Sequence, residues 1–282
     1  MRQKGFPKFH ILFQEGQLMK TITICQRKGG SGKSTSALNL ACVLAEQGYR
    51  VLIIDLDDQQ NTTSTVSRLV QGESNIEQLL LNDDVDLKGV CYSTDWKNVW
   101  ILPSSSNLSG AVKALDGEVG GHLVLKEKLS RSNDFDFVLA DTSPSLNILV
   151  LNSLCASDFI FIPLSSKFFS LTGLKMSLSA FSKIQKRLNP SLHLLGMGFV
   201  IHDKRNALAN EIVEMVRGQY PDLLFESLIG INIKIEEAQV KKQSILSYAP
   251  CDRGADQYRK LGQEILDRIA GYEAAGKVAA HV

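Results

Sequence analysis

Short apolar runs alternate along most of the chain with longer stretches in which apolar and polar residues recur at helical spacing. An apolar run of about four to eight residues is typical of a strand that is buried on both faces. Such runs predict strands at residues 21–25, 51–55, 99–102, 137–141, 159–163, 194–201 and 227–231. We expect helices between these strands.

This alternation predicts an α/β fold, a doubly wound and mostly parallel sheet with helices on both faces. Length alone would allow two domains in 282 residues, because a domain has about 150 residues. No low-complexity linker or internal repeat interrupts the alternation, so we expect a single domain over residues 19–270. Residues 1–18 are expected to form an N-terminal extension or disordered arm, and residues 271–282 a C-terminal tail.

The segment 258–269 places Leu261, Ile265 and Ile269 at helical spacing. One interpretation is an amphipathic helix that lies on a membrane, and the other is a helix packed on the sheet. We favour the second, because the tail that follows is rich in alanine and lacks the basic face and bulky aromatic residues of a membrane-surface helix. No run approaches the roughly 20 apolar residues of a membrane span.

Composition narrows the classes of partner and site. The formal net charge is +1 at pH 7, so any contact with nucleic acid must come from a local basic patch. The five cysteines are scattered, and the five histidines show no ligand spacing. Neither a disulfide framework nor a zinc site is therefore indicated.

A glycine-rich loop, Lys28-Gly29-Gly30-Ser31-Gly32-Lys33-Ser34-Thr35, separates a predicted strand from a predicted helix. The ordinary phosphate-binding pattern G-x-x-x-x-G-K-[ST] fails, because Arg27 stands where its first glycine belongs. The pattern K-G-G-x-G-K-[ST] remains, and its glycines let backbone N–H groups point at phosphate oxygens beside a helix N-terminus. We predict that Lys33 reaches the β- and γ-phosphates and that Ser34 binds Mg²⁺. A second lysine, Lys28, is not needed to bind one nucleotide. It would have a role if it reached across a dimer to the phosphates bound by the partner subunit.

Two further apolar runs end in carboxylates. Asp55 ends the run that begins at Val51, and Asp141 ends the run that begins at Phe137. Ligands of open α/β sheets bind beyond the carboxyl ends of the strands. Asp55 and Asp141 are therefore expected to hold Mg²⁺ through water, whereas a single aspartate after a strand is more often a turn or cap residue.

More segments follow the loop in a fixed order. Asp55 opens D-L-D-D-Q-Q-N-T-T, Asp141 opens D-T-S-P-S, and Asn232 opens N-I-K-I-E-E-A, which R-G-A follows at Arg253. Between them lies L-N-S-L-C-A-S-D, from Leu151. In this order and spacing the chain resembles the ParA/MinD group of deviant Walker ATPases, and within it the Soj-like ParA proteins of DNA partition. The resemblance covers most of residues 19–269.

The resemblance implies ATP and Mg²⁺ as ligands and a role for each matching residue. Lys28 would contact the nucleotide in the opposite subunit of an ATP-bound homodimer, and Lys33 would bind phosphate within its own subunit. Asp57 would position the attacking water, and Asp141 would be the Walker B carboxylate. The whole phosphate cradle would be Lys28, Gly29, Gly30, Ser31, Gly32, Lys33, Ser34 and Thr35. Phosphoryl transfer agrees with these roles, because it needs charge neutralisation and an oriented water more than a strong base.

The resemblance also implies a surface that binds duplex DNA without sequence preference. Arg205 matches the family's D-x-R-x-N segment, and Lys234 stands where relatives carry an arginine. The expected DNA contacts are Arg205, Lys234, Lys204, Lys241 and Lys242. The alternative for each basic group is an ordinary solvated surface.

The chain departs from the family pattern at several positions. Asp58 replaces a proline, and its extra carboxylate should repel nucleotide unless it faces outward. Ser143 replaces the first proline of D-T-P-P, which is expected to loosen a turn. Ile231 replaces an arginine of the DNA-binding surface, which weakens that surface.

Three functions are therefore compared. The first is a DNA-segregation ATPase in the cytoplasm and on the nucleoid: an ATP-bound homodimer binds non-specific duplex DNA, and a ParB-type centromere-binding protein stimulates its slow hydrolysis. The second is a MinD-like positioning ATPase that acts at a membrane or on a protein cargo. The third is a nucleotide-gated adaptor that does not hydrolyse ATP. The C-terminal segment argues against the membrane, and Asp57 with Lys28 argues against the adaptor.

Overall fold

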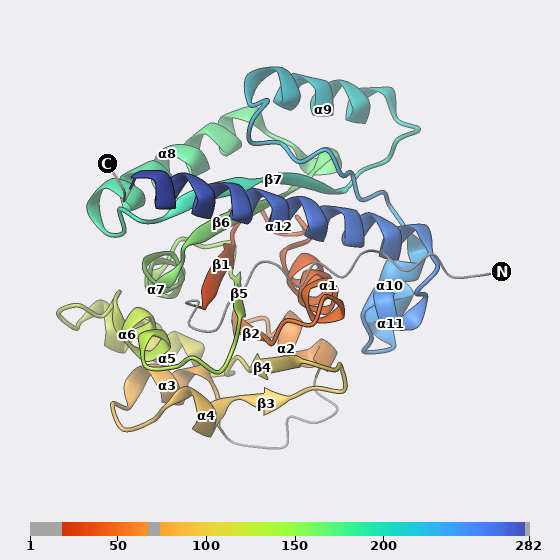
Figure 1. Ribbon diagram of the computed structural model, residues 1–282. Helices are drawn as coiled ribbons and strands as arrows, with labels where there is room; N and C mark the ends of the chain where they lie inside the picture. The colour runs from red at the N-terminus through yellow and green to blue at the C-terminus, as the bar shows by residue number, and fades with distance from the viewer. Residues whose placement is uncertain (1–18, 67–73, 280–282) are drawn as a thin grey trace.

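The computed structural model describes residues 19–66 and 74–279. The predicted extension 1–18 lies outside the described residues. The predicted α/β class is confirmed, because one sheet of seven strands in the order β3-β4-β2-β5-β1-β6-β7 carries helices on both faces (Figure 1). The strands are β1 (Lys20–Ile24), β2 (Val51–Leu56), β3 (Tyr92–Ser93), β4 (Val99–Leu102), β5 (Phe137–Thr142), β6 (Phe159–Ser165) and β7 (His193–Ile201).

The helices occupy the connections between these strands and the C-terminal third of the chain. They are α1 (Lys33–Glu46), α2 (Asn61–Val66), α3 (Ile76–Leu81), α4 (Leu87–Val90), α5 (Leu108–Asp116), α6 (Val124–Ser130), α7 (Ile148–Ala156), the 3₁₀ turn η1 (Ser166–Phe168), α8 (Leu171–Arg187), α9 (Ala207–Gln219), α10 (Ile233–Val240), α11 (Ile245–Tyr248) and α12 (Arg253–Ala279).

All strand pairs in the sheet are parallel except β3 with β4. The strand β1 lies between β5 and β6, and the order of the chain reverses on its two sides. This is a topological switch point, where the loops at the carboxyl ends of neighbouring strands diverge and leave room for a ligand. The fold therefore places the loop after β1 at the natural binding edge of the sheet.

Alternate residues of each strand enter different cores. In β2, Val51 and Ile53 pack with α1 and α12, whereas Leu52 and Ile54 pack with α3, α5 and α7. A third cluster covers β6 and β7 with α8 and α9. Burial on both faces explains why these strands are visible in the sequence as continuous apolar runs instead of alternating patterns.

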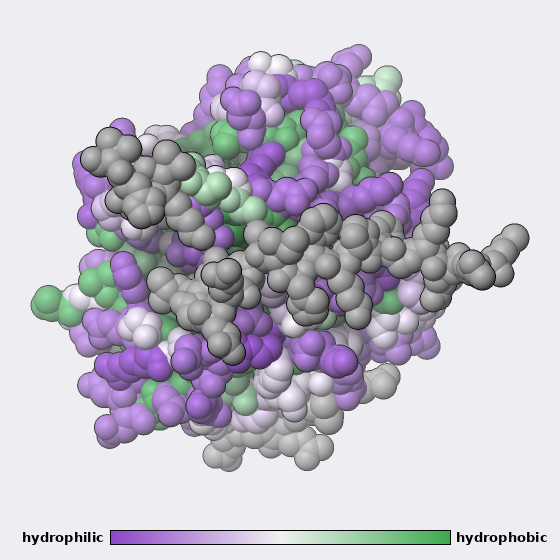
Figure 2. All heavy atoms as spheres, viewed as in Figure 1, coloured by the Kyte–Doolittle hydropathy of each residue, from purple (hydrophilic) through white to green (hydrophobic). Residues whose placement is uncertain are grey.

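The C-terminal helix α12 packs on the sheet, as the second interpretation of segment 258–269 predicts. Leu261, Ile265 and Ile269 are almost fully buried in the core that α1 shares. The helix lies toward the viewer in Figure 1, and the described surface in the same view of Figure 2 is a mixture of hydrophilic and hydrophobic residues. The helix continues to Ala279, through most of the predicted tail. Within the described part of the chain, no helix is long and apolar enough to cross a membrane.

The predicted strand at residues 227–231 is wrong. Ile229 donates its N–H group to the Phe199 carbonyl oxygen at 2.8 Å, and His202 donates to the Ile229 carbonyl oxygen at 3.0 Å, but the strand-like pairing of this segment is limited to an isolated bridge between His202 and Gly230. The apolar run reflects the complete burial of Ile229 and not a continuous ladder. The short antiparallel strand β3 was not predicted, because two residues give no periodic signal.

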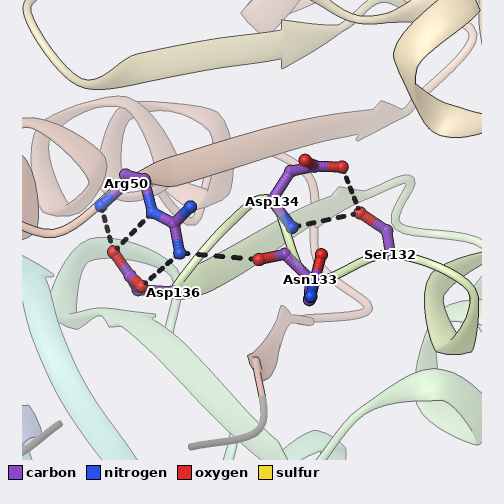
Figure 3. A network of polar contacts seen from close by, with 5 residues as sticks. All are labelled: Arg50, Ser132, Asn133, Asp134 and Asp136. Carbon is purple, nitrogen blue, oxygen red and sulfur yellow. Dashed lines mark hydrogen bonds and ion pairs between the residues drawn. The ribbon is translucent and has the colours of Figure 1, made fainter. Parts of the chain in front are cut away.

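A polar cluster fixes the register of β2 against β5 at the edge opposite the phosphate loop (Figure 3). The Arg50 guanidinium group donates to Asp136 Oδ1 at 2.9 Å, and the Arg50 N–H group donates to Asp136 Oδ2 at 2.7 Å. Asp136 returns a backbone hydrogen bond to the Arg50 carbonyl at 2.8 Å. These contacts align Val51 with Phe137, and four steps later they align Asp55 with Asp141.

Candidate active site

The glycine-rich loop joins β1 to α1 and leaves the first turn of the helix open. Gly30 and Gly32 have φ angles of 69° and 84°, in the region that favours glycine. Gly32 occupies the N-cap position of α1, and no side chain caps it. The N–H groups at the start of α1 and the positive end of its dipole therefore form an anion site.

A groove of about 560 Å³ lies over this loop. Lys33 and Asp57 both line it, and both are more than nine-tenths buried. The full lining is Gly29, Gly30, Ser31, Gly32, Lys33, Ser34, Thr35, Asp57, Gln59, Asn61, Ser64, Thr65, Pro144, Gln239 and Val240. The groove thus unites most of the predicted phosphate cradle with the aspartate predicted to position water.

Asp55 and Asp141 face one another on adjacent strands below the groove. They are partners in the β2–β5 register, and both are 0% exposed. The α2 hydroxyl groups of Thr62 and Thr63 donate to Asp141 Oδ2 at 2.8 Å and to Asp55 Oδ2 at 2.7 Å. Burial raises the pKa of Asp55 to about 7, and the charge of Asp141 adds to this rise. Burial likewise raises the pKa of Asp141 to about 6, although Ser34 and Thr62 lower it.

These side chains fit a magnesium ion held jointly with phosphate oxygens. Asp141 Oδ1 is fully buried and has no hydrogen-bond partner among the described residues. The donors are hard oxygens, and Mg²⁺ usually takes only one or two protein carboxylates. Within the described residues, no group of three or more His, Cys, Asp or Glu side chains could hold a metal alone. The chain therefore offers a partial site that a nucleotide would complete.

Asp57 is held firmly at the rim of the groove. Its N–H group donates to Asp55 Oδ1 at 3.1 Å, and its carboxylate accepts from the Gln59 N–H group at 3.1 Å. Burial raises the pKa of Asp57, whereas the Gln59 contact lowers it. Asp58 is exposed and does not line the groove. The extra carboxylate is thus outside the groove lining, but it lies beside the Asp57 carboxylate and raises the pKa of Asp57.

Lys28 lies beside the groove but not in it. It is exposed, and it lines a separate hollow of about 360 Å³ between the phosphate loop and the start of α8. Apolar walls of this hollow include Leu164, Phe169 and Met176. Residues 29–31 line both this hollow and the groove, so Lys28 stands where the two adjoin.

The residues predicted to bind DNA fall into two groups. Lys204 and Arg205 are exposed and line a third hollow of about 490 Å³, together with His202 and Ile231. Arg205 forms an ion pair with Asp203 at 3.1 Å. The second group is α10 and the turn after it. Lys234 pairs there with Glu237 at 2.9 Å, and Lys241 and Lys242 are exposed. Every one of these basic side chains is at the surface.

Sequence reasoning gave no role to several side chains that hold this site together. Thr62, Thr63 and Ser104 bind the aspartates or the backbone beside them, and Gln239 donates to the Thr35 hydroxyl group at 2.7 Å. Thr62 and Thr63 lie inside the motif that begins at Asp55. The motif marked this segment as functional, but it did not indicate which aspartates the two threonines bind. Nothing in the local sequence marked Ser104 or Gln239.

Known proteins resemble this chain over most of its length. A family model described as an AAA domain matches residues 19–194. The chromosome-partitioning ATPase Soj of Treponema pallidum is 38% identical over 250 residues, which cover 88% of this chain and 98% of that protein. The structure of cobyrinic acid a,c-diamide synthase from Mycobacterium smegmatis, with bound ADP and magnesium, matches with a TM-score of 0.75 at 27% identity and covers 88% of this chain and 94% of the other. A plasmid partition protein from Borrelia burgdorferi matches with a TM-score of 0.69 at 25% identity, covering 89% of this chain and 100% of the other.

Proposed function

The chain belongs to the Soj and ParA family of partition ATPases, and on this premise we propose that it hydrolyses ATP with Mg²⁺ to drive segregation of a plasmid or chromosome. The observation that carries this proposal is the groove in which Lys33 and Asp57 meet above the buried Asp55–Asp141 pair. The choice of ligands is supported by solved structures of cobyrinic acid a,c-diamide synthase, which has the same fold and was solved with ADP and magnesium and with an ATP analogue and magnesium.

Each polar group at the groove has one task in this proposal. The open first turn of α1 and Lys33 bind the β- and γ-phosphates. Ser34, Asp55 and Asp141 would hold Mg²⁺, the two aspartates through water. The ion would neutralise charge that develops on the phosphate oxygens. Asp57 accepts a hydrogen bond from the attacking water and directs it at the γ-phosphorus.

Lys28 supports an ATP-dependent homodimer. It borders the hollow beside the groove, and in a face-to-face dimer it would contact phosphates that the partner subunit binds. The apolar wall of the same hollow, with Met176 at 55% exposure, would be covered at the same time. Because the contact exists only when nucleotide is present, ATP would favour the dimer and hydrolysis would release it.

The dimer would bind duplex DNA through Arg205, Lys204, Lys234, Lys241 and Lys242. These side chains are exposed, and a dimer doubles their number on one assembly. A DNA phosphate would replace the Asp203 carboxylate beside Arg205, which is an exchange of one charge-assisted hydrogen bond for another. A ParB-type protein would stimulate the slow basal hydrolysis, and this cycle would take place in the cytoplasm on the nucleoid.

The decisive experiment measures binding to non-specific duplex DNA with ATP, with ADP and without nucleotide over a series of salt concentrations. We expect binding only with ATP, and we expect it to weaken with salt as phosphate contacts do. Arg205→Ala should weaken binding, whereas Arg131→Ala, an exposed arginine beyond α6, should not. Absence of DNA binding by a dimer that still binds ATP would contradict the partition proposal.

A positioning ATPase with a protein cargo is the second candidate, and the surface beside Arg205 favours it. Ile231 is 47% exposed and Ile233 is 66% exposed. Both lie between the two basic groups, and Ile231 stands where relatives are expected to carry an arginine. Exposed isoleucines next to basic residues suit a protein surface better than a phosphate backbone. The same DNA-binding experiment separates the two candidates.

A further inference from the structure

Ser104, two residues after the end of β4, lies beside the backbone of Asp57 although 47 positions separate them in the chain. The side chain is 6% exposed, and its hydroxyl group donates to the Asp57 carbonyl oxygen at 2.7 Å. The N–H group of Ser104 donates to the Thr63 hydroxyl group at 2.9 Å, and that hydroxyl donates to Asp55 Oδ2. Ser104 therefore connects the loop after β4 to Asp57 directly and to Asp55 through Thr63.

The Asp57 backbone is consequently held on both sides. Its N–H group is bound by the Asp55 carboxylate, and its carbonyl oxygen is bound by Ser104. Fixing both peptide groups fixes the direction of the bond from Cα to Cβ, and with it the position of the carboxylate. Gln59 also binds that carboxylate, through its backbone N–H group, but Gln59 is exposed. It therefore does not fix Asp57 from the buried side, as Asp55 and Ser104 do.

A second layer of contacts holds the loop that carries Ser104. The Glu77 carboxylate, in the first turn of α3, accepts from Ser105 Oγ at 2.7 Å and from Asn107 Nδ2 at 2.7 Å. The Ile76 N–H group donates to the Pro103 carbonyl oxygen at 2.9 Å. The loop 103–107 is thus attached to α3 on one side and to Asp57 on the other.

We propose that Ser104 is a positioning residue for ATP hydrolysis, which holds Asp57 in the place from which it directs the attacking water, with Glu77 as the outer support of its loop. The inference rests on the proposed role of Asp57. Loss of the Ser104 hydroxyl group would leave ATP binding intact, because Ser104 does not line the groove. It would let Asp57 shift, and small displacements of a positioning group lower the rate of reaction steeply.

The test compares Ser104→Ala with the wild type in a phosphate-release assay at saturating MgATP, with nucleotide affinity measured separately using a fluorescent ATP analogue. Ser104→Ala retains the backbone contact to Thr63 and removes only the hydroxyl group. We expect kcat to fall about tenfold, with KM and affinity changed by less than about twofold. Ser104→Thr, which keeps a hydroxyl group, should recover much of the rate, and Glu77→Gln should lower kcat by about threefold.

Ser153→Ala is the matched control, because Ser153 is also buried and its hydroxyl donates to a backbone carbonyl at 2.9 Å, but in α7 away from the groove. A purely structural role for Ser104 would give equal rates for the two alanine variants at equal thermal stability, which would overturn the inference. Asp57→Ala serves as the reference. If Asp57→Ala is inactive and Ser104→Ala is fully active, only the inference fails. If Asp57→Ala hydrolyses ATP normally, the proposed role of Asp57 fails with it.

Discussion

The buried Asp55–Asp141 pair should make the metal-free protein less stable as the pH rises, and Asp55→Asn should remove part of this effect. Burial and the neighbouring carboxylate raise the pKa of Asp55 from 3.8 to about 7 in the folded state. Below pH ~4 both the folded and the unfolded chain hold the proton, so Asp55 contributes nothing there. Between pH ~4 and ~7 the unfolded chain loses its proton while the folded chain keeps it, so unfolding becomes progressively easier.

The size of the effect follows from the shift. A displacement of about three pKa units corresponds to about 4 kcal/mol, at ~1.4 kcal/mol for each unit. The asparagine loses the charge, but its single amide oxygen cannot replace both carboxylate oxygens, which accept from the Asp57 N–H group and from the N–H and hydroxyl groups of Thr63. We therefore expect a net gain of roughly 1–3 kcal/mol over the wild type at pH 8, which in a chain of this size is a rise of roughly 2–8 °C in Tm. The gain should vanish or become a loss as the pH falls to 4.

Thermal unfolding followed by circular dichroism in EDTA, at pH values from 4 to 8, measures this difference. Asp116→Asn is the control, because Asp116 is an exposed aspartate at the end of α5, and this variant should not show the gain at pH 8. Addition of MgATP should reverse the order of the proteins, since the charged pair then gains a partner. A variant that is no more stable than the wild type at pH 8, or a gain that persists unchanged to pH 4, would refute this account of the pair.

Three further predictions concern the groove and its neighbours. Lys33→Ala should abolish binding of a fluorescent ATP analogue, whereas Asp57→Ala should bind it and accumulate as an ATP-bound dimer in size-exclusion chromatography; wild-type hydrolysis by Asp57→Ala would show that another group orients the water. Lys28→Ala should bind ATP as a monomer with nearly unchanged affinity but fail to dimerise, and a normal ATP-dependent dimer would remove the cross-subunit role. Gly32→Ala should lower the free energy of unfolding by about 1–3 kcal/mol, because φ is 84° and the new methyl group would lie 2.7 Å from a β7 side chain. The control is Gly29→Ala, whose methyl group would meet nothing within 4 Å, so its thermal unfolding should be nearly unchanged. Equal effects of the two substitutions would contradict the strain argument.

The fold could be predicted from the sequence because strands buried on both faces leave continuous apolar runs. The same property explains the error at residues 227–231, since an apolar run reports burial and does not reveal whether the backbone forms a ladder. Ile229 is buried beside β7 and bonds to it, yet its segment pairs only at isolated positions. Two-residue β3 fell below the length at which a period can be recognised.

The phosphate loop and the aspartates could be found because their chemistry requires particular residue types at fixed spacing. Their supporting contacts could not be found in this way. The Ser104 hydroxyl group meets Asp57 across 47 positions, and Gln239 meets Thr35 across 204. Such pairs depend on how β4 and α10 pack against β2 and α1. A serine or glutamine offers the same hydrogen-bond donor anywhere in a chain, so the residue type alone does not identify its partner.

The contacts around Asp55 also explain why a costly arrangement is stable enough to persist. Two carboxylates buried side by side oppose folding at neutral pH, and a chain selected for stability alone would replace one of them with an uncharged residue. The chain instead surrounds them with donors: Thr63 gives two hydrogen bonds to Asp55, and Thr62 gives one to Asp141. These donors lower both pKa values but do not restore them to the ordinary range. The remaining negative potential attracts a divalent cation, so the instability of the free site and its affinity for MgATP have the same physical origin.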